Sequence, residues 1–137
     1  MIVLDGNRLI FGRLATHVAK KLLQGEEVHV INAENIVITG DRLGIIERYR
    51  QRRRLQHKGT PEHSPVWPRM PNLLVRRMIR GMLPWKSSRG KEAYKRLRVY
   101  SSNPKRLANP VTLETAKLAR EELPHMTVLE LCRQLGM

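Results

Sequence analysis

The feature that most constrains the fold is a strand–helix–strand pattern in the first part of the chain. Buried strands are predicted at residues 2–4 and 28–32, and the segment from Gly12 to Gly25 between them has helical character. Its apolar side chains recur at every fourth position: Leu14, Val18 and Leu22. Two strands joined by one helix form a parallel pair with a right-handed crossover. The sequence therefore predicts an α/β fold, with a third short strand at residues 36–39.

The next predicted helix covers residues 42–54 and is rich in arginine. Asp41 or Thr39 can cap its first turn, and its thin apolar edge consists of Leu43, Ile46 and Tyr49. Residues 55–71 hold four prolines and one glycine without periodicity. We expect an extended loop there, ordered by a partner, while Pro71 can occupy the first turn of the following helix.

The segment from Arg76 to Tyr100 combines a core-forming helix with a dense run of cations. Apolar side chains at helical spacing form one stripe: Leu74, Val75, Met78, Ile79 and Met82. Gly81 and Pro84 are expected to stop this helix, since glycine tolerates a left-handed backbone and proline cannot continue a helix. A second basic helix is predicted from about residue 89 to 97, with Ser88 as its N-cap.

The last part of the chain is predicted to contain a strand, a linker and two helices. Residues 98–100 form the strand, and residues 101–110 form the linker or an extended arm. A helix over 112–123 ends at Pro124, and its apolar set is Leu113, Ala116, Leu118 and Ala119. Thr127 caps a short final helix with Val128, Leu131, Cys132 and Leu135 on one face. At 137 residues, the chain 1–137 is expected to be one domain.

Basic residues gather in the middle of the chain, and we call residues 42–106 the basic belt. The belt holds 19 of the 26 lysines and arginines but only three acids (Glu47, Glu62 and Glu92), a net charge of +16. The two flanks together hold seven basic and nine acidic residues, a net charge of −2. The belt is therefore expected to bind a polyanion. Arginine, which outnumbers lysine there, can grip a phosphate through two hydrogen bonds.

Among polyanions, the sequence favours folded RNA. The six aromatic residues are scattered, which argues against a stacking platform for single strands. No helix-turn-helix, zinc-finger or heptad pattern is present for reading DNA, and no basic helix has the bulky aromatic face of a membrane-surface helix. Folded RNA is recognised through phosphates and 2′-hydroxyl groups. Trp67 and Trp85 could each stack on one unpaired base, or simply be half-buried beside proline.

The strand–helix–strand pattern also raises the alternative of a dinucleotide-binding enzyme. The glycine fingerprint G-x-G-x-x-G and the phosphate loop G-x-x-x-x-G-K-[ST] are absent, and Glu34 alone is weak evidence. The five histidines are dispersed without a cysteine or acid cluster, so no metal site is predicted. Cys132 is interpreted as a core residue rather than a nucleophile. We predict neither catalysis nor a cofactor nor a small-molecule substrate.

The sequence favours a cytoplasmic protein. No apolar run approaches the roughly 20 residues of a membrane span, so no membrane partner is expected. The first residues enter a strand-like run without the signals of a leader. The single cysteine excludes an internal disulfide, which fits a reducing compartment.

Three sequence blocks resemble a known family. The blocks are GRLA at 12–15 with VAK at 18–20, VINAE at 30–34 with TG at 39–40, and RGMLP at 80–84 with RG at 89–90 and LRVY at 97–100. In this order they resemble the universal large-subunit ribosomal protein number thirteen family. The loop with proline and tryptophan before Pro71 and the helical C-terminal tail resemble its archaeal and eukaryotic branch.

The resemblance implies a three-layer α/β/α fold with a four-stranded parallel sheet, extended by the basic helices and a variable C-terminal tail, residues 101–137. It also implies a structural, non-enzymatic protein without a cofactor, located in the large ribosomal subunit. Such a protein binds large-subunit rRNA of the 23S or 28S type early in assembly and lies beside other large-subunit proteins. The motif positions that carry this implication are Arg13, Arg80, Gly81, Pro84, Arg89 and Arg98.

From the belt and the motifs together, we expect a defined set of RNA-binding residues. These are Arg13, Arg48, Arg50, Arg52, Arg53, Arg54, Lys58, Arg69, Arg76, Arg77, Arg80, Lys86, Arg89, Lys91, Lys95, Arg96 and Arg98. Gly81 and Pro84 are expected to form a structural turn that sets the angle between the basic helices. Two other hypotheses stay open: a small nucleotide- or RNA-processing enzyme using Asp5, Glu34 and Asp41, and a general nucleic-acid compaction protein.

Overall fold

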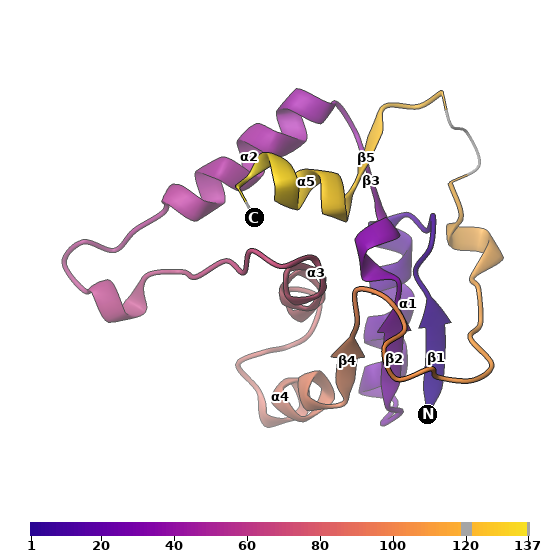
Figure 1. The fold of residues 1–137 in the computed structure, drawn as a ribbon. Coiled ribbons are helices and arrows are strands. Elements are labelled where there is room, and N and C mark those ends of the chain that lie inside the picture. The colour runs from indigo at the N-terminus through magenta and orange to yellow at the C-terminus, as the bar shows by residue number, and fades with distance from the viewer. Residues whose placement is uncertain (119–121, 137) are drawn as a thin grey trace.

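The fold is described by a computed structural model for residues 1–118 and 122–136. The strands are β1 (Ile2–Asp5), β2 (Val28–Ile31), β3 (Val37–Thr39), β4 (Leu97–Val99) and β5 (His125–Thr127). The α-helices are α1 (Phe11–Leu23), α2 (Arg42–Arg54), α3 (Pro71–Arg80), α4 (Ser88–Lys95) and α5 (Val128–Gln134), and 3₁₀ turns lie at Ala33–Asn35, Pro61–His63 and Glu114–Ala116. Figure 1 shows β1, β2 and β4 side by side, with α3 and α4 beyond the β4 edge and α2 above them beside α5.

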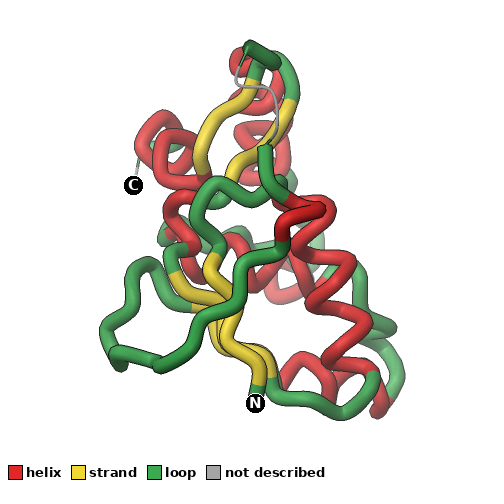
Figure 2. Tube along the Cα trace, turned by 90° about the vertical axis from the view of Figure 1, so that its right-hand side faces the viewer, coloured by secondary structure: helices red, strands yellow, loops and turns green. Residues whose placement is uncertain are grey.

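The predicted strand–helix–strand unit is confirmed and forms the centre of the fold. β1 and β2 pair in parallel, with Leu4 beside Val30, and β4 pairs in parallel with the other edge of β2. Helix α1 runs along one face of this sheet (Figure 2). Its predicted stripe of Leu14, Val18 and Leu22 is fully buried. This packing fixes the sheet on which the rest of the chain is arranged.

The expected fourth parallel strand does not belong to this sheet, which has three strands within the described residues. β3 instead pairs antiparallel with β5 in a separate two-stranded sheet. The chain turns away after β2 because Asn32 adopts a left-handed backbone conformation with φ of 55° and a 3₁₀ turn follows. At the free edge of β1, Val111 forms a single parallel bridge with Leu4. Its N–H donates to the Val3 carbonyl oxygen at 2.8 Å, and its carbonyl oxygen accepts from the Asp5 N–H at 3.0 Å.

The described residues also place no helix on the second face of the sheet, so the three-layer arrangement is not found there. Leu4, Val30 and Leu97 point into the main core with α1. On the opposite face, His29 stacks on Tyr100 with ring centroids 6.0 Å apart. The segment that follows Tyr100 crosses this face as a loop, seen in orange in Figure 1. A loop thus takes the place of the second helical layer.

Helix α2 has its predicted bounds and its predicted cap. The Asp41 carboxylate accepts a hydrogen bond from the Gly44 N–H at 3.0 Å. The helix contacts the core through Ile45 and Tyr49, whereas Leu43 is 77% exposed. The predicted apolar edge is therefore correct at Tyr49 and at Ile46, which is partly buried against the core, and wrong at Leu43. Ile45 contacts the core instead of Leu43, because residues two apart on a helix point to different sides.

Helix α3 begins at Pro71 as predicted and buries Leu74, Val75 and Ile79. Met82, which was predicted to lie on the buried stripe, is 43% exposed. Leu83, which is 6% exposed, occupies that core position instead. The left-handed conformation expected for Gly81 is wrong, since its φ is −63°. The chain instead turns through short-range bonds in which Met82 donates to Ile79 and Leu83 donates to Arg80.

Helix α4 begins one residue earlier than predicted, and its cap is Ser87 rather than Ser88. The Ser87 hydroxyl oxygen accepts from the Gly90 N–H at 3.2 Å and its hydroxyl donates to the Pro84 carbonyl oxygen at 2.8 Å. The strand expected at 98–100 is β4, which begins and ends one residue earlier.

The helix predicted over 112–123 is wrong in its described part. Only one 3₁₀ turn occurs there, and Lys117 bridges Leu9 in antiparallel geometry. Backbone groups that bond to distant strands cannot form helical hydrogen bonds, and this explains the difference. Ala116 is buried and Leu113 and Leu118 are partly buried, whereas Ala119 lies outside the described residues.

The final helix is confirmed as α5. The Thr127 hydroxyl caps it by accepting from the Glu130 N–H at 3.2 Å. Val128, Leu131 and Cys132 are fully buried, and Leu135 is partly buried. The strand β5 that precedes it was not predicted. The part of the tail that forms β5 and α5 is therefore an integral part of the core.

Candidate nucleic-acid interface

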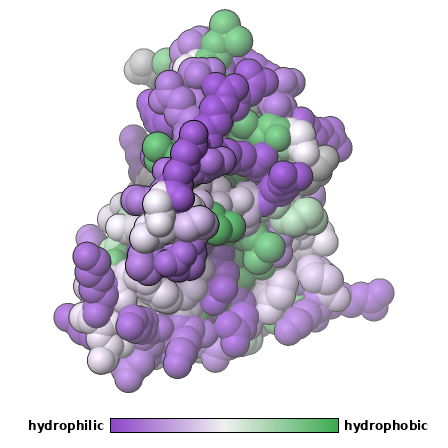
Figure 3. Space-filling view, turned by 90° about the vertical axis from the view of Figure 1, so that its left-hand side faces the viewer, coloured by the Kyte–Doolittle hydropathy of each residue, from purple (hydrophilic) through white to green (hydrophobic). Residues whose placement is uncertain are grey.

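The basic belt runs from α2 through the loop of residues 55–70, α3 and α4 to β4 and the start of the loop after it. Helices α2, α3 and α4 occupy the left side of Figure 1. Figure 3 shows this side of the molecule, and hydrophilic residues cover most of it. Among the residues that the structure describes, one belt cation has an acidic partner: Arg42 pairs with Glu130 of α5 at 2.9 Å. Apart from Arg42, the belt cations therefore have no ion-paired acid within the described chain.

The expected RNA-binding residues fall into three groups according to what holds their side chains. The first group is exposed: Arg48, Arg50, Arg54, Lys58, Arg69, Lys86, Arg89, Lys91 and Lys95. These side chains project from α2, the loop, the turn after α3, and α4. Long flexible cations without acidic partners are suited to reach phosphates at varied positions.

The second group consists of arginines that lie on aromatic rings, and α3 is its centre. The guanidinium of Arg76 lies 4.2 Å from the ring centre of Tyr94, and that of Arg80 lies 4.7 Å from the ring centre of Trp85. The two rings touch edge to face with centroids 5.1 Å apart. Since both rings belong to α4 and the turn before it, these contacts connect α3 to α4.

The remaining two stacked arginines meet at Trp67 in the loop. Arg77 of α3 lies 4.5 Å from the Trp67 ring centre, and Arg52 of α2 lies 5.1 Å from it. Arg52 also lies 4.8 Å from the ring centre of Tyr49, which meets Trp67 edge to face. The loop tryptophan thereby connects the two arginine-bearing helices.

The third group donates hydrogen bonds to backbone carbonyl oxygens. Arg13 donates to Thr115, Arg53 to Leu135, Arg96 to Leu22, and Arg98 to Lys95, at 3.0, 2.8, 2.7 and 3.1 Å. Arg96 thus meets the C-terminal end of α1, where free carbonyl groups carry partial negative charge. A carbonyl holds an arginine in place but does not cancel its charge.

Burial and like charges act together on Arg77. Burial lowers the pKa of this guanidinium first, and the nearby positive charge of Arg80 lowers it further, while Tyr94 opposes the change. Arginine nevertheless stays protonated in proteins. Arg77 is thus a partly buried cation that lies near another positive charge.

The turn between α3 and α4 depends on a glycine that the motif contained but that we did not single out. A Cβ atom on Gly90 would lie 2.0 Å from the Pro84 carbonyl oxygen, whereas one on Gly81 would meet only the Met78 carbonyl oxygen, at 3.3 Å. Among the glycines of the described chain, Gly90 is therefore the one that other backbone atoms approach most closely. The sequence feature that could have identified Gly90 is its position next to Arg89 in the third sequence block.

Sequence reasoning also missed the aromatic partners of the arginines. Tyr49 and Trp67, like Trp85 and Tyr94, appeared scattered along the chain. The structure brings them together around α3. No local pattern reports such pairs, because they join residues from different elements.

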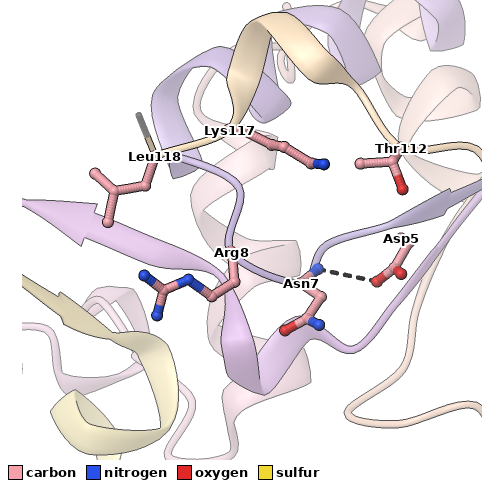
Figure 4. Close-up of a pocket in the computed structure, with 6 residues that line it drawn as sticks. All are labelled: Asp5, Asn7, Arg8, Thr112, Lys117 and Leu118. Atoms are coloured by element: carbon pink, nitrogen blue, oxygen red, sulfur yellow. Dashed lines mark hydrogen bonds between the residues drawn. The ribbon is translucent and has the colours of Figure 1, made fainter. Parts of the chain in front are cut away.

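The cavity at the end of β1 bears on the enzyme hypothesis. It measures about 390 Å³ and is lined by Asp5, Asn7, Arg8, Thr112, Lys117 and Leu118. In Figure 4 the Asp5 carboxylate meets the backbone N–H of Asn7, and the Arg8 side chain points away from Lys117. Asp5 also accepts from the Asn32 side chain, and the Asp41 carboxylate caps α2. Two of the three candidate acids thus have structural partners.

Other chemistry finds no support in the described residues. They contain no group of three or more histidine, cysteine or acidic side chains that could hold a metal ion. Cys132 is buried, and this burial raises the pKa of its thiol. No helix in the described part of the chain is long and apolar enough to cross a membrane.

Comparison with known proteins gives a family assignment. The model of the family described as ribosomal protein L13 matches residues 1–106. The chain belongs to the ribosomal protein L13 family. Members of this family are structural ribosomal proteins and not enzymes, so the resemblance carried by the three sequence blocks is confirmed.

Three similar proteins from archaea span nearly the whole chain. A large ribosomal subunit protein uL13 from Methanococcoides burtonii is 44% identical, with 99% of this chain and 98% of the relative covered. The protein of the same name from Archaeoglobus fulgidus is 42% identical, with coverages of 98% and 86%. That from Methanocaldococcus jannaschii is 41% identical, with coverages of 99% and 98%. The similarity therefore includes the C-terminal tail.

Proposed function

We propose that this protein is a structural constituent of the large ribosomal subunit and binds large-subunit rRNA, of the 23S or 28S type, through the basic belt. The observation that carries the proposal is the uncompensated charge of the belt. Its net charge is +16, and among the belt cations of the described chain Arg42 alone pairs with an acid. A rigid surface of this kind is suited to a phosphate backbone, which RNA supplies at high density.

In this proposal the three groups of basic residues have different roles in binding. The exposed group reaches phosphates directly. The ring-stacked and carbonyl-bound groups hold α2, α3 and α4 at fixed separations, so that RNA segments that repel one another are bridged by preorganised cations. Guanidinium groups whose charge is not cancelled by carboxylates remain available to phosphate. Such bridging stabilises the folding of rRNA early in assembly and persists in the finished subunit.

The turn of Gly81 and Pro84 is proposed to keep α3 and α4 at the angle that this bridging needs. The Pro84 carbonyl oxygen accepts from both the N–H and the hydroxyl of Ser87. Neighbouring large-subunit proteins are proposed as further partners, in ribosomes of the cytoplasm. Exposed apolar side chains such as Leu43 and Val66, at 77% and 79%, are suited to such contacts.

The proposal is tested by comparing two RNAs of equal length across a salt series. The full chain is titrated into large-subunit rRNA and into an unrelated structured RNA. For about eight phosphate contacts, affinity should fall by roughly a thousandfold or more between about 50 and 200 mM salt, by analogy with DNA. The rRNA should retain a clear preference at physiological salt. Equal affinities that vanish together would contradict the proposal and indicate a general compaction protein.

A further inference from the structure

A second cavity lies inside the basic belt, where α2, the loop and α3 meet. It measures about 260 Å³ and is lined by Phe11, Tyr49, Arg52, Trp67, Arg77, Met78 and Gly81. Two of these lining residues are arginines, and none is an acid. The remaining wall is aromatic or apolar apart from the glycine. The cavity thus joins two positive charges to a flat apolar surface.

This combination limits what the cavity can hold. An uncharged apolar ligand would leave two guanidinium groups desolvated without compensation. A bare phosphate would not need the aromatic wall. A nucleotide supplies both a phosphate and a flat base that stacks on aromatic side chains or on guanidinium planes. The volume, close to the roughly 300 Å³ at which ligand pockets begin, suits a single nucleotide rather than a base pair.

The polar groups of the wall are already arranged for this occupant. The Tyr49 hydroxyl donates to the Met78 sulfur at 2.9 Å and is therefore already paired. The ring is the part of Tyr49 that is left to contact a ligand. Arg52 and Arg77 both lie over Trp67, at 5.1 and 4.5 Å from its ring centre, so the ring fixes both guanidinium groups. No carboxylate within the described chain pairs with either of them. A phosphate placed there would accept hydrogen bonds from two fixed forks.

We propose that this cavity binds one unpaired nucleotide of RNA, with its phosphate held by Arg52 and Arg77 and its base against the wall formed with Trp67. The proposal rests on the proposed RNA-binding function and adds a specific site to it. In this proposal Trp67 contacts one nucleotide of RNA, so its fluorescence should change when that nucleotide binds. RNA that is fully paired lacks a free base and does not fill the cavity.

The first test uses tryptophan fluorescence. The chain has two tryptophans, so the W85F variant leaves Trp67 as the single emitter. A short single-stranded RNA should quench this emission on binding, whereas the same sequence as a duplex, or inorganic phosphate, should leave it nearly unchanged. The reciprocal W67F variant should show little quenching from Trp85. Unchanged Trp67 emission at full RNA binding, measured by anisotropy, would overturn the proposal and leave the belt function standing.

The second test adds a side chain to a residue at the edge of the cavity, without changing charge. In G81V, the added side chain stands on a residue that lines the cavity, and only the Met78 carbonyl oxygen lies within 4 Å of its Cβ. Affinity for the single-stranded RNA should fall about tenfold, the effect of losing one stacked base, with an unchanged salt slope. The control is G59V in the exposed loop, which has nothing within 4 Å of its Cβ. Equal affinities for G81V and G59V would refute the site.

The third test compares two arginines of the same belt. R77Q removes a cavity guanidinium, and R50Q removes an exposed one outside it. Circular dichroism first establishes that both variants are folded. R77Q, made in the W85F background, should abolish the quenching of Trp67, whereas R50Q should only weaken binding at low salt. Full quenching in R77Q would contradict the proposed phosphate contact.

Discussion

At the scale of single residues, Gly90 decides whether α4 can lie against the turn that precedes it. A Cβ at this position would lie 2.0 Å from the Pro84 carbonyl oxygen and 3.0 Å from the Trp85 nitrogen, which are backbone atoms that cannot rotate away. We expect G90A to lower the free energy of unfolding by about 2 kcal/mol or more, as overpacking does. Urea denaturation monitored by circular dichroism measures this change.

Gly12 provides the control for that substitution. It lies in the first turn of α1 with nothing within 4 Å of an added Cβ. G12A should leave stability unchanged or raise it by up to about 1 kcal/mol, because alanine favours helix. If G90A were as stable as G12A, the close approach of α4 to Pro84 would be wrong.

The two adjacent serines before α4 differ in their expected roles. Ser87 caps the helix and bonds Pro84, whereas Ser88 is the first helical residue and is exposed. S87A should therefore cost about 1 kcal/mol of stability, the usual value of an N-cap, and S88A should cost little. Thermal denaturation of the two variants measures the difference. A larger loss of stability in S88A than in S87A would show that Ser88, the cap predicted from the sequence, caps the helix.

At the scale of elements, the sequence predicted what local patterns determine. The bounds of α2, the Asp41 and Thr127 caps and the start of α3 at Pro71 follow from side chains near the feature they control. Strand pairing involves distant residues and was not predictable in this way. The pairing of β3 with β5 and the bridge from Val111 to β1 decide the sheet and prevent a helix over 112–118.

The same distinction applies to the candidate interface. Its charge is a property of composition and was evident from the sequence. Its arrangement was not, because Arg77 and Trp67, or Arg80 and Trp85, meet through tertiary packing. Burial of the backbone at Gly90 is likewise a tertiary property. The sequence could name the cations but not the side chains that hold them.

The C-terminal elements β5 and α5 are expected to be indispensable to the fold. Met126, Val128 and Leu131 are buried, and Arg42 and Arg53 of α2 bond to Glu130 and the Leu135 carbonyl oxygen. A chain of residues 1–106, the range that the family model matches, should lack cooperative unfolding. Calorimetry measures this property. A sharp transition in the truncated chain would show that the tail is an accessory.

A single substitution tests the same claim in the full chain. L131A removes a fully buried side chain of α5 and should cost about 2–5 kcal/mol. Q134A, on the exposed side of the same helix, serves as the control and should change stability by less than about 0.5 kcal/mol. Equal urea midpoints for the two variants would contradict the structural role assigned to α5.

At the scale of the whole molecule, the chain uses one surface to form the core and a separate surface to carry positive charge. One face of the parallel sheet packs with α1 in the core, while α2 and α3 carry cations held by rings and carbonyl groups. Carboxylates would hold these side chains as well but would cancel their charge. Neutral partners therefore explain how these arginines are held in place while the belt keeps its net charge of +16.

This separation predicts where neutralisation weakens RNA binding. The triple variant R48Q/R50Q/R54Q removes three exposed charges of α2, whereas K20Q/R133Q removes two exposed charges outside the belt. Each lost phosphate contact should reduce the slope of log affinity against log salt by about 0.7 to 0.9. The belt variant should therefore lose roughly two units of slope on large-subunit rRNA, and the flank variant almost none. Equal losses of slope per charge removed would show that RNA responds to net charge alone and that the belt is not a defined surface.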